Sequence, residues 1–118
     1  MIWTMICKPF EVVNVPFPFT DRPLSKIRKA LVLSSEIHNE KNGATILCMI
    51  TSAERSNWLG DLKIINWEKA GLKKPCIIRL KLFTLDNTLI IEKKGDLQTK
   101  DRIEFKEQLL GLMPFLSR

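Results

Sequence analysis

Cationic side chains gather in a few short stretches of this sequence. The densest stretch is RPLSKIRK, at residues 22–29. Three pairs follow along the chain: Lys73 and Lys74, Arg79 and Lys81, and Lys93 and Lys94. An arginine guanidinium is planar and always charged, so it can meet two phosphate oxygens at once. The stretches therefore indicate phosphate or polyanion binding, although any one of them could equally be a solvated face.

The chain as a whole is basic. It has 118 residues, of which 19 are Lys or Arg and 13 are Asp or Glu, giving a formal net charge of +6 and a pI near 9.4. This balance favours a polyanionic or acidic partner. Hydrophobic residues make up 45% of the chain, which is enough for one core, so we expect a single domain over residues 1–118.

The sequence offers little support for disulfides, metal sites or membrane segments. Cys7, Cys48 and Cys76 are odd in number and widely spaced, so we expect reduced, buried thiols. His38 is the one histidine, and no paired Cys or His spacing occurs, so we expect no metal and no cofactor. The apolar start MIWTMIC is too short to span a bilayer and Lys8 follows it, which predicts a cytoplasmic protein.

Short runs typical of β-strands, separated by turn residues, extend to about residue 92. Six runs are expected to form strands: residues 11–15, 29–35, 44–51, 62–65, 76–83 and 88–93. Asn42-Gly43 predicts a hairpin-like turn before the third run. In the second run Leu31 and Leu33 alternate with Val32, so this strand is apolar on both faces, as in a barrel.

A stiff segment, VPFPFTD at residues 15–21, leads into the basic loop. Each proline fixes its own φ, biases the preceding residue toward extended geometry and lacks an N–H group. The segment therefore predicts an edge strand, or a rigid wall beside a site.

Two helices are expected. NWEKAGL has Asn66 as an N-cap, Gly71 as a stop and Trp67 turned inward, and TKDRIEFKEQLLGLM begins with Thr99 as a cap. Apolar residues recur at helical spacing in the second segment. The fold class expected is α+β, mainly β: a small SH3-like barrel of about six strands, with a C-terminal helix and one short internal helix.

Four segments, taken in order, resemble one protein family. EVVNVPFPFTD with SKIRKALVLSS, then ILCMITS, INWEKAGLKKPCIIRLKLFTLD and LIIEKKGDLQTKDRIEFKEQL are similar to the PemK-like branch of the MazF/PemK toxins, from about Phe10 to Leu110. The resemblance implies a small homodimeric endoribonuclease toxin with a cognate antitoxin. It also implies cleavage of single-stranded RNA without a metal: a ribose 2′-hydroxyl attacks the adjacent phosphate, leaving a 2′,3′-cyclic phosphate and a 5′-hydroxyl.

The resemblance carries the family's best matched functional positions to Arg28 and Thr51. We expect Arg28 to bind phosphate oxygens that gain charge in the transition state, and Thr51 to add a neutral hydroxyl donor. Glu11 is a candidate for accepting the 2′-hydroxyl proton, or it only ties the first strand to a loop; Glu54 and His38 are the other titratable groups. Further RNA contacts are expected from Arg22, Lys26, Lys29, Ser52, Trp58, Arg79 and Lys81. Trp58 either stacks on an unpaired base or packs on its own barrel.

Four positions depart from the family's pattern. Phe10 stands where a glycine is usual, Lys29 where a proline follows the arginine, and Leu80 where some relatives have an active-site acid. Cys76 stands where a serine is usual. These departures leave open a catalytically silent RNA- or peptide-binding module. A poison of DNA gyrase that acts by protein contact alone is disfavoured, because the motifs follow the nuclease branch.

The partners implied by the resemblance agree with the composition. An acidic, partly disordered antitoxin would suit the charge of +6 as well as single-stranded RNA would. Beyond the last predicted helix, Met113, Phe115 and Leu116 are surplus to a monomer's core and could pack on a second copy.

Overall fold

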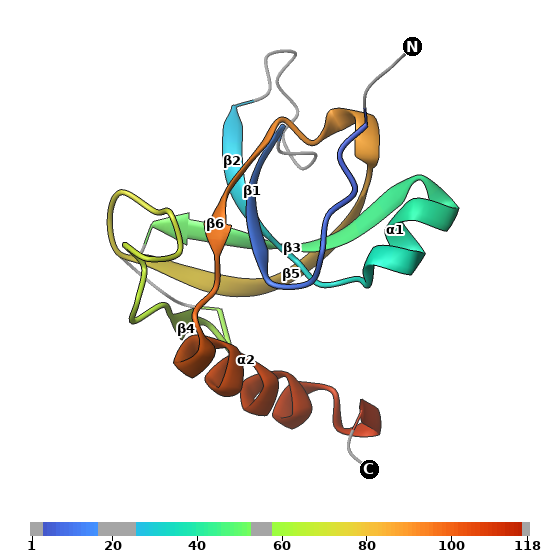
Figure 1. Ribbon diagram of the computed structural model, residues 1–118. Coiled ribbons are helices and arrows are strands. Elements are labelled where there is room, and N and C mark those ends of the chain that lie inside the picture. Colours follow the sequence, from blue (N-terminus) through green and yellow to red (C-terminus); the bar gives the residue numbers. More distant parts are fainter. Residues whose placement is uncertain (1–3, 17–25, 53–57, 117–118) are drawn as a thin grey trace.

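The computed structural model describes residues 4–16, 26–52 and 58–116, and shows one antiparallel sheet curled into a half-barrel (Figure 1). The six strands are β1 (Glu11–Pro16), β2 (Ile27–Val32), β3 (Ala44–Ser52), β4 (Leu62–Lys63), β5 (Cys76–Asp86) and β6 (Glu92–Asp96). They lie in the order β4-β5-β3-β2-β1-β6. The expected fold class, a mainly β barrel-like sheet with one short internal helix and one C-terminal helix, is confirmed.

The helices are α1 (Glu36–Asn42) and α2 (Thr99–Leu112), with short 3₁₀ turns η1 (Asn87–Leu89) and η2 (Pro114–Leu116). The C-terminal helix lies where the sequence predicts it, except that Gln98 rather than Thr99 is the N-cap. Within the described ranges, no helix has both the length and the apolar character needed to cross a bilayer.

The short internal helix lies at residues 36–42, not at residues 66–71 as the sequence analysis expects. Ser35 caps it by accepting a 3.1 Å hydrogen bond from the His38 N–H, and Gly43 ends it with a φ of 67°. Residues 66–71 form only a hydrogen-bonded turn, in which the Ala70 N–H donates to the Asn66 carbonyl at 3.2 Å. Asn42-Gly43 therefore joins a helix to β3 rather than two strands.

The last strand also begins later than residue 88, the start that the sequence predicts. Asp86 accepts hydrogen bonds from the Thr88 N–H at 3.0 Å and the Thr88 hydroxyl at 2.8 Å, which favours a turn. The buried Asn87 side chain accepts from Thr45 at 2.7 Å and donates to the Asn39 carbonyl at 2.8 Å. These bonds hold η1 against α1 and β3, so the strand pairing starts only at Glu92.

The two faces of the sheet carry separate apolar clusters. The first cluster includes Leu31 of β2 and Phe105 of α2, so α2 covers this face (Figure 1). The second includes Val32 of β2 and Cys7 of the N-terminal segment, which crosses the other face. Because successive residues of a strand point to opposite faces, the apolar run of β2 supplies both clusters, as its sequence predicts.

The three cysteines are buried and unpaired, as expected for reduced core thiols. Burial raises the pKa of Cys7 to about 11 and that of Cys48 to about 12. Neither thiol therefore ionises near neutral pH, which leaves both inert as nucleophiles.

Phe10 adopts a φ of 72°, in the left-handed region that favours glycine. This geometry explains why a glycine is the usual residue here in the family that the sequence resembles. The Phe10 ring packs edge-on against Phe105 at 6.3 Å, and the Arg102 guanidinium carbon lies 5.0 Å from its centre. We infer that this packing of β1 against α2 offsets a backbone strain of about 1–2 kcal/mol.

Candidate functional site

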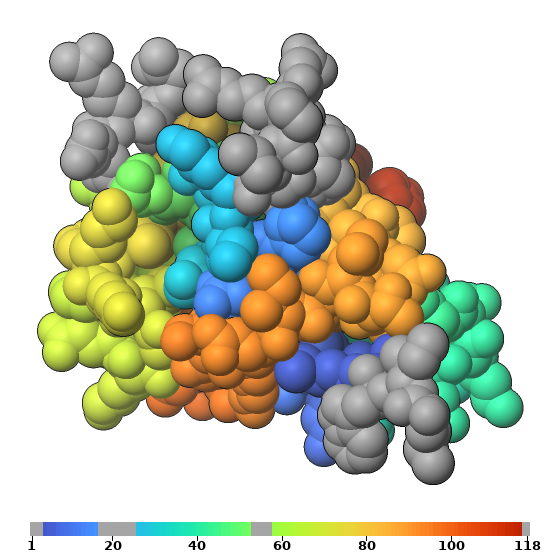
Figure 2. Space-filling model, turned by 90° about the horizontal axis from the view of Figure 1, so that it is seen from above, coloured from blue at the N-terminus to red at the C-terminus, as the bar shows by residue number. Residues whose placement is uncertain are grey.

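Arg28 and Thr51 lie just beyond the end of the β2–β3 ladder. Lys29 lies opposite Ile50 and Ala30 opposite Met49, and Arg28 and Thr51 each come one residue beyond the pair Lys29 and Ile50. Continuing this register would set the two residues opposite one another on one face of the sheet. Figure 2 shows this end of β2 at the surface, in cyan, between the green end of β3 and the blue end of β1.

Arg28 and Thr51 lie at the rim of the second apolar cluster. Ala30 belongs to that cluster and Met49 packs against it, and Arg28 and Thr51 lie two residues beyond them on the same face. Arg28 is exposed, while Thr51 is half-buried and also pairs with Ile77 of β5. An exposed guanidinium and a half-buried hydroxyl are groups that can bind a phosphate.

Arg79 of β5 lies one row further along the same face, opposite Met49. Its guanidinium donates two hydrogen bonds to Asp61, from Nε to Oδ1 at 3.1 Å and from Nη2 to Oδ2 at 2.8 Å. The Arg79 side chain is 20% exposed and that of Asp61 is 4% exposed. Hydrogen bonding to Asp61 raises the pKa of Arg79 further, so the guanidinium remains charged in a fixed orientation.

Trp58 lies beside two of the predicted RNA-binding cations. Its ring centre is 5.8 Å from the Arg79 guanidinium carbon and 5.9 Å from the Lys81 ammonium, and the side chain is 45% exposed. Both cations come from the same side of β5, because Leu80 between them packs against the first apolar cluster. The structure therefore brings Trp58, Arg79 and Lys81 together, next to the rim that carries Arg28 and Thr51.

Leu80 and Lys81 lie in an irregular part of β5. Between Cys48 and Met49 of β3 the register steps from Leu82 to Arg79, so β5 has a bulge at these two residues. Leu80 points into the core rather than beside Trp58. The position that differs from the family's acid thus has a packing role in this chain.

Lys29 and Ser52 point away from Arg28 and Thr51, because they alternate with them along β2 and β3. Ser52 lies opposite Cys76, whose pKa burial raises, while the charges of Lys74 and then Lys29 lower it less. Lys26 is exposed and directly precedes β2. Arg22 and the segment VPFPFTD beyond Pro16 lie outside the described residues.

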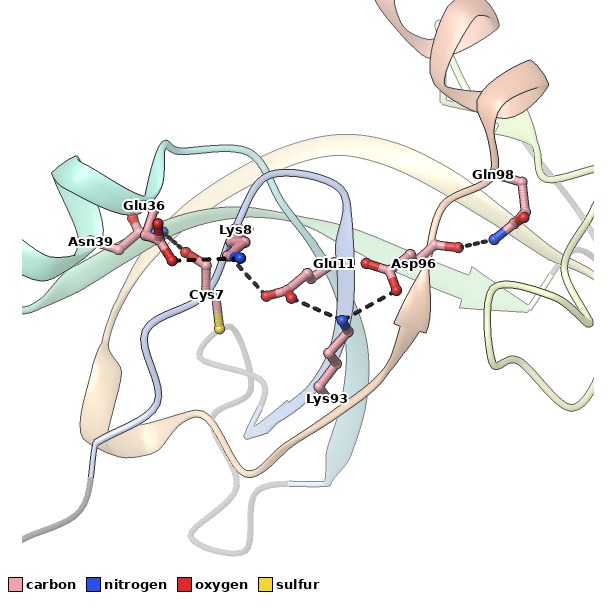
Figure 3. A network of polar contacts seen from close by, with 8 residues as sticks. All are labelled: Cys7, Lys8, Glu11, Glu36, Asn39, Lys93, Asp96 and Gln98. Carbon is pink, nitrogen blue, oxygen red and sulfur yellow. Dashed lines mark hydrogen bonds and ion pairs between the residues drawn. The ribbon is translucent and has the colours of Figure 1, made fainter.

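Glu11 lies at the opposite end of β1 from the Arg28 pair. Arg28 pairs with Val15, four residues from Glu11, or about 13 Å along the strand. Figure 3 shows the Glu11 carboxylate accepting from the Lys8 N–H at 2.8 Å and contacting the Lys93 ammonium at 3.0 Å. Lys93 also contacts Asp96 at 3.2 Å, and bonds to Glu11 and then Asp96 raise its pKa. These contacts tie β1 to another strand, β6, whereas the sequence analysis offered a tie to a loop as the structural alternative.

Of the other two titratable candidates, the structure describes only His38, and it lies away from Arg28. His38 lies on α1, where its Nδ1 is 3.1 Å from Asn39 Oδ1, and α1 leads into the start of β3, whereas Thr51 is near the end. Glu54 lies outside the described residues. Within the described ranges, no group of three or more His, Cys, Asp or Glu side chains could hold a metal ion.

Asp61 is the residue of this region that the sequence analysis missed. It is a single acid within WLGDLK, with no spacing that sets it apart. Its importance follows from the β4–β5 register, in which Leu62 pairs with Ile78 and Asp61 therefore comes next to Arg79. The sequence could have signalled this pair only if the β4–β5 register had been known, because that register is what sets the acid opposite the arginine.

The comparison with protein families decides the family. A profile described as PemK-like, MazF-like toxin of type II toxin-antitoxin system matches residues 8–112. The chain belongs to this family. No curated protein matches its sequence.

Solved structures of MazF toxins share the fold of this toxin. They include a MazE-MazF crystal structure (Form-III) from Deinococcus radiodurans, with 18% identity, a TM-score of 0.72, and coverage of 93% of this chain and 98% of that one. Mycobacterium tuberculosis toxin MazF-mt6 has 14% identity, a TM-score of 0.70, and coverage of 88% and 96%. An endoribonuclease in complex with its cognate antitoxin, from a mycobacterial species, has 8% identity, a TM-score of 0.69, and coverage of 92% and 94%.

Proposed function

We propose that this toxin is an endoribonuclease that cleaves single-stranded RNA without a metal ion. The observation that supports the proposal is the β2–β3 ladder, which ends at the pair Lys29 and Ile50, one residue before Arg28 on β2 and Thr51 on β3, in a chain of this family. A related structure is titled as an endoribonuclease with its cognate antitoxin, which agrees with this activity.

In the proposed reaction the ribose 2′-hydroxyl attacks the neighbouring phosphate and the bond to the 5′-oxygen breaks. The products are a 2′,3′-cyclic phosphate and a 5′-hydroxyl. Negative charge builds on the non-bridging phosphate oxygens in the transition state, where Arg28 supplies a cationic fork and Thr51 a neutral donor. Because both groups sit on β-strands, their separation is set by the sheet rather than by a loop.

The proposal extends to partners and to location. An acidic antitoxin segment would cover the cationic side of the sheet and so block RNA, and the toxin would act in the cytoplasm as a single domain over residues 1–118. A second copy would pack on the apolar residues that α2 and η2 leave exposed, among them Ile103 at 52% and Phe115 at 80%. These assignments follow from family membership and from the charge and exposure of the chain.

The test is an incubation of the purified toxin with long single-stranded RNA in EDTA, followed by analysis of fragment ends. We expect cyclic-phosphate ends, and we expect Arg28→Ala to slow cleavage by about a hundredfold or more. Lys41→Ala is the matched control, because it removes one positive charge from exposed α1, at the far end of β3. It should cleave at the wild-type rate.

Two results would contradict the proposal in different ways. Full cleavage by Arg28→Ala would remove Arg28 from the reaction. RNA that stays intact but binds with a strong dependence on salt would instead identify a catalytically silent binding module, the second function that the departures at Lys29 and Leu80 leave open.

A further inference from the structure

Asp61 is unusual for this region because it is a buried acid on a cationic side of the sheet. Its carboxylate is 4% exposed and accepts two hydrogen bonds from one guanidinium. Removing a carboxylate from water costs free energy, which a two-point bond to arginine offsets without a large net gain. The pair therefore contributes little to stability by itself, and its main consequence is a fixed position for Arg79.

The fixed guanidinium lies beside an exposed aromatic ring. Trp58 is 45% exposed although Arg79 and Lys81 both lie within 6 Å of its ring centre. The two cations lie on the same side of β5 and close to the ring, which keeps almost half of its surface exposed to solvent. A guanidinium has five N–H donors, and the bonds to Asp61 use two of them.

This arrangement matches the chemistry of one unpaired nucleotide. A nucleotide presents a flat base and an anionic phosphate a few ångströms apart, and the Trp58 subsite offers a ring and two cations at a similar spacing. Arg79 also lies opposite Met49, which is two residues, or about 7 Å, along β3 from Thr51. Because only β3 lies between β5 and β2, a base on Trp58 would belong to a nucleotide close to a phosphate at Arg28.

We propose that Trp58 is a stacking platform for an unpaired RNA base next to the cleaved phosphate, and that Asp61 is a positioning residue that holds Arg79 against the ring. The inference rests on the proposed RNA-cleaving function, and it adds a subsite to it. It explains why an acid is kept within a cationic surface: Asp61 orients one arginine instead of attracting a ligand.

The test measures binding of two oligonucleotides that the toxin cannot cleave. Both carry 2′-O-methyl riboses, which removes the attacking hydroxyl, and one has its bases while the other is abasic at every position. We expect the toxin to prefer the base-bearing strand, since stacking on an aromatic ring favours each bound base by roughly 5- to 150-fold. Charge alone would bind the two strands equally.

Three variants separate stacking from charge. Trp58→Leu should lose the preference for the base-bearing strand and leave abasic binding unchanged, while Trp58→Phe should retain most of the preference. Asp61→Asn removes a negative charge, so a purely electrostatic surface would bind both strands more tightly. If Asp61 positions Arg79, Asp61→Asn should instead reduce the preference for the base-bearing strand.

Each remaining outcome has a defined meaning. Equal binding of both strands by the wild type, or an unchanged preference in Trp58→Leu, overturns the subsite while cleavage and its loss in Arg28→Ala stand. Binding of neither strand overturns the proposed RNA function itself. A Trp58→Leu variant that loses affinity for polyglutamate, with no change toward either oligonucleotide, assigns the ring to an acidic peptide and overturns the base platform.

Discussion

Asp101 should be one of the most important polar side chains for the stability of this toxin. It is 1% exposed, and its two carboxylate oxygens accept from the Ile65 and Asn66 N–H groups, each at 2.9 Å. These bonds join the first turn of α2 to the turn that follows β4, across 35 residues of chain. Asp101 also lies near the helix N-terminus, where a negative charge is favourable.

The expected cost of Asp101→Ala follows from these contacts. A hydrogen bond to a charged group contributes about 1.5–3 kcal/mol, and the substitution leaves two partly buried N–H groups without this acceptor. We therefore expect the free energy of unfolding to fall by about 3–5 kcal/mol, a large share of the usual 5–15 kcal/mol of a domain. Asp101→Asn should lose much of the same stability, because its amide group turns a donor toward one of the two N–H groups.

The assay is equilibrium unfolding in urea, monitored by tryptophan fluorescence, with the midpoint and the slope fitted for each variant. Asp86→Ala is the matched control, because this exposed aspartate also accepts two hydrogen bonds, but only from Thr88 nearby in sequence. It should cost much less than Asp101→Ala, because solvent can replace the lost bonds of an exposed side chain. The reasoning is refuted if Asp101→Ala costs no more than Asp86→Ala at an unchanged slope.

Two further predictions concern the core. A Cβ atom at Gly95 would lie 2.3 Å from the Ala70 carbonyl oxygen, so Gly95→Ala should lower the free energy of unfolding by about 3 kcal/mol. Gly43→Ala, where a Cβ meets nothing within 4 Å, should cost only about 1 kcal/mol from its positive φ, and equal costs in urea would contradict this contact. The raised pKa of Cys48, about 12 against 9.0 when unfolded, means that the native state keeps a thiol proton that the unfolded state loses, so stability should fall as the pH rises from 9 toward 12. Cys48→Ala should reduce the slope of unfolding free energy between pH 8 and 10.5, and an unchanged slope would argue against buried Cys48 as its source.

The structure shows how two departures from the family's pattern, Phe10 and Leu80, are packed. Phe10 keeps the positive φ of a glycine and compensates by packing its ring on α2. Leu80 fills core space at the bulge of β5. Apolar contacts thus accommodate both residues, and these contacts do not involve Arg28 or Thr51.

The sequence by itself predicted that six strands and a C-terminal helix exist, because alternation and helical periodicity report burial directly, although it began the last strand too early. It misplaced the short helix, because Asn42-Gly43 was interpreted as a hairpin turn whereas Gly43 ends α1. Order along the chain, together with the family resemblance, also selected Arg28 and Thr51 in advance.

Only the tertiary structure decided which of these residues face one another. Strand register is set by pairing between distant segments, and a shift of one residue reverses every side chain. Register therefore turns Lys29 and Ser52 to the face opposite that of Arg28 and Thr51. It sets Glu11 at the far end of β1. It also joins Asp61 to Arg79, beside Trp58. No local pattern encodes such contacts, because each depends on where a second strand happens to lie.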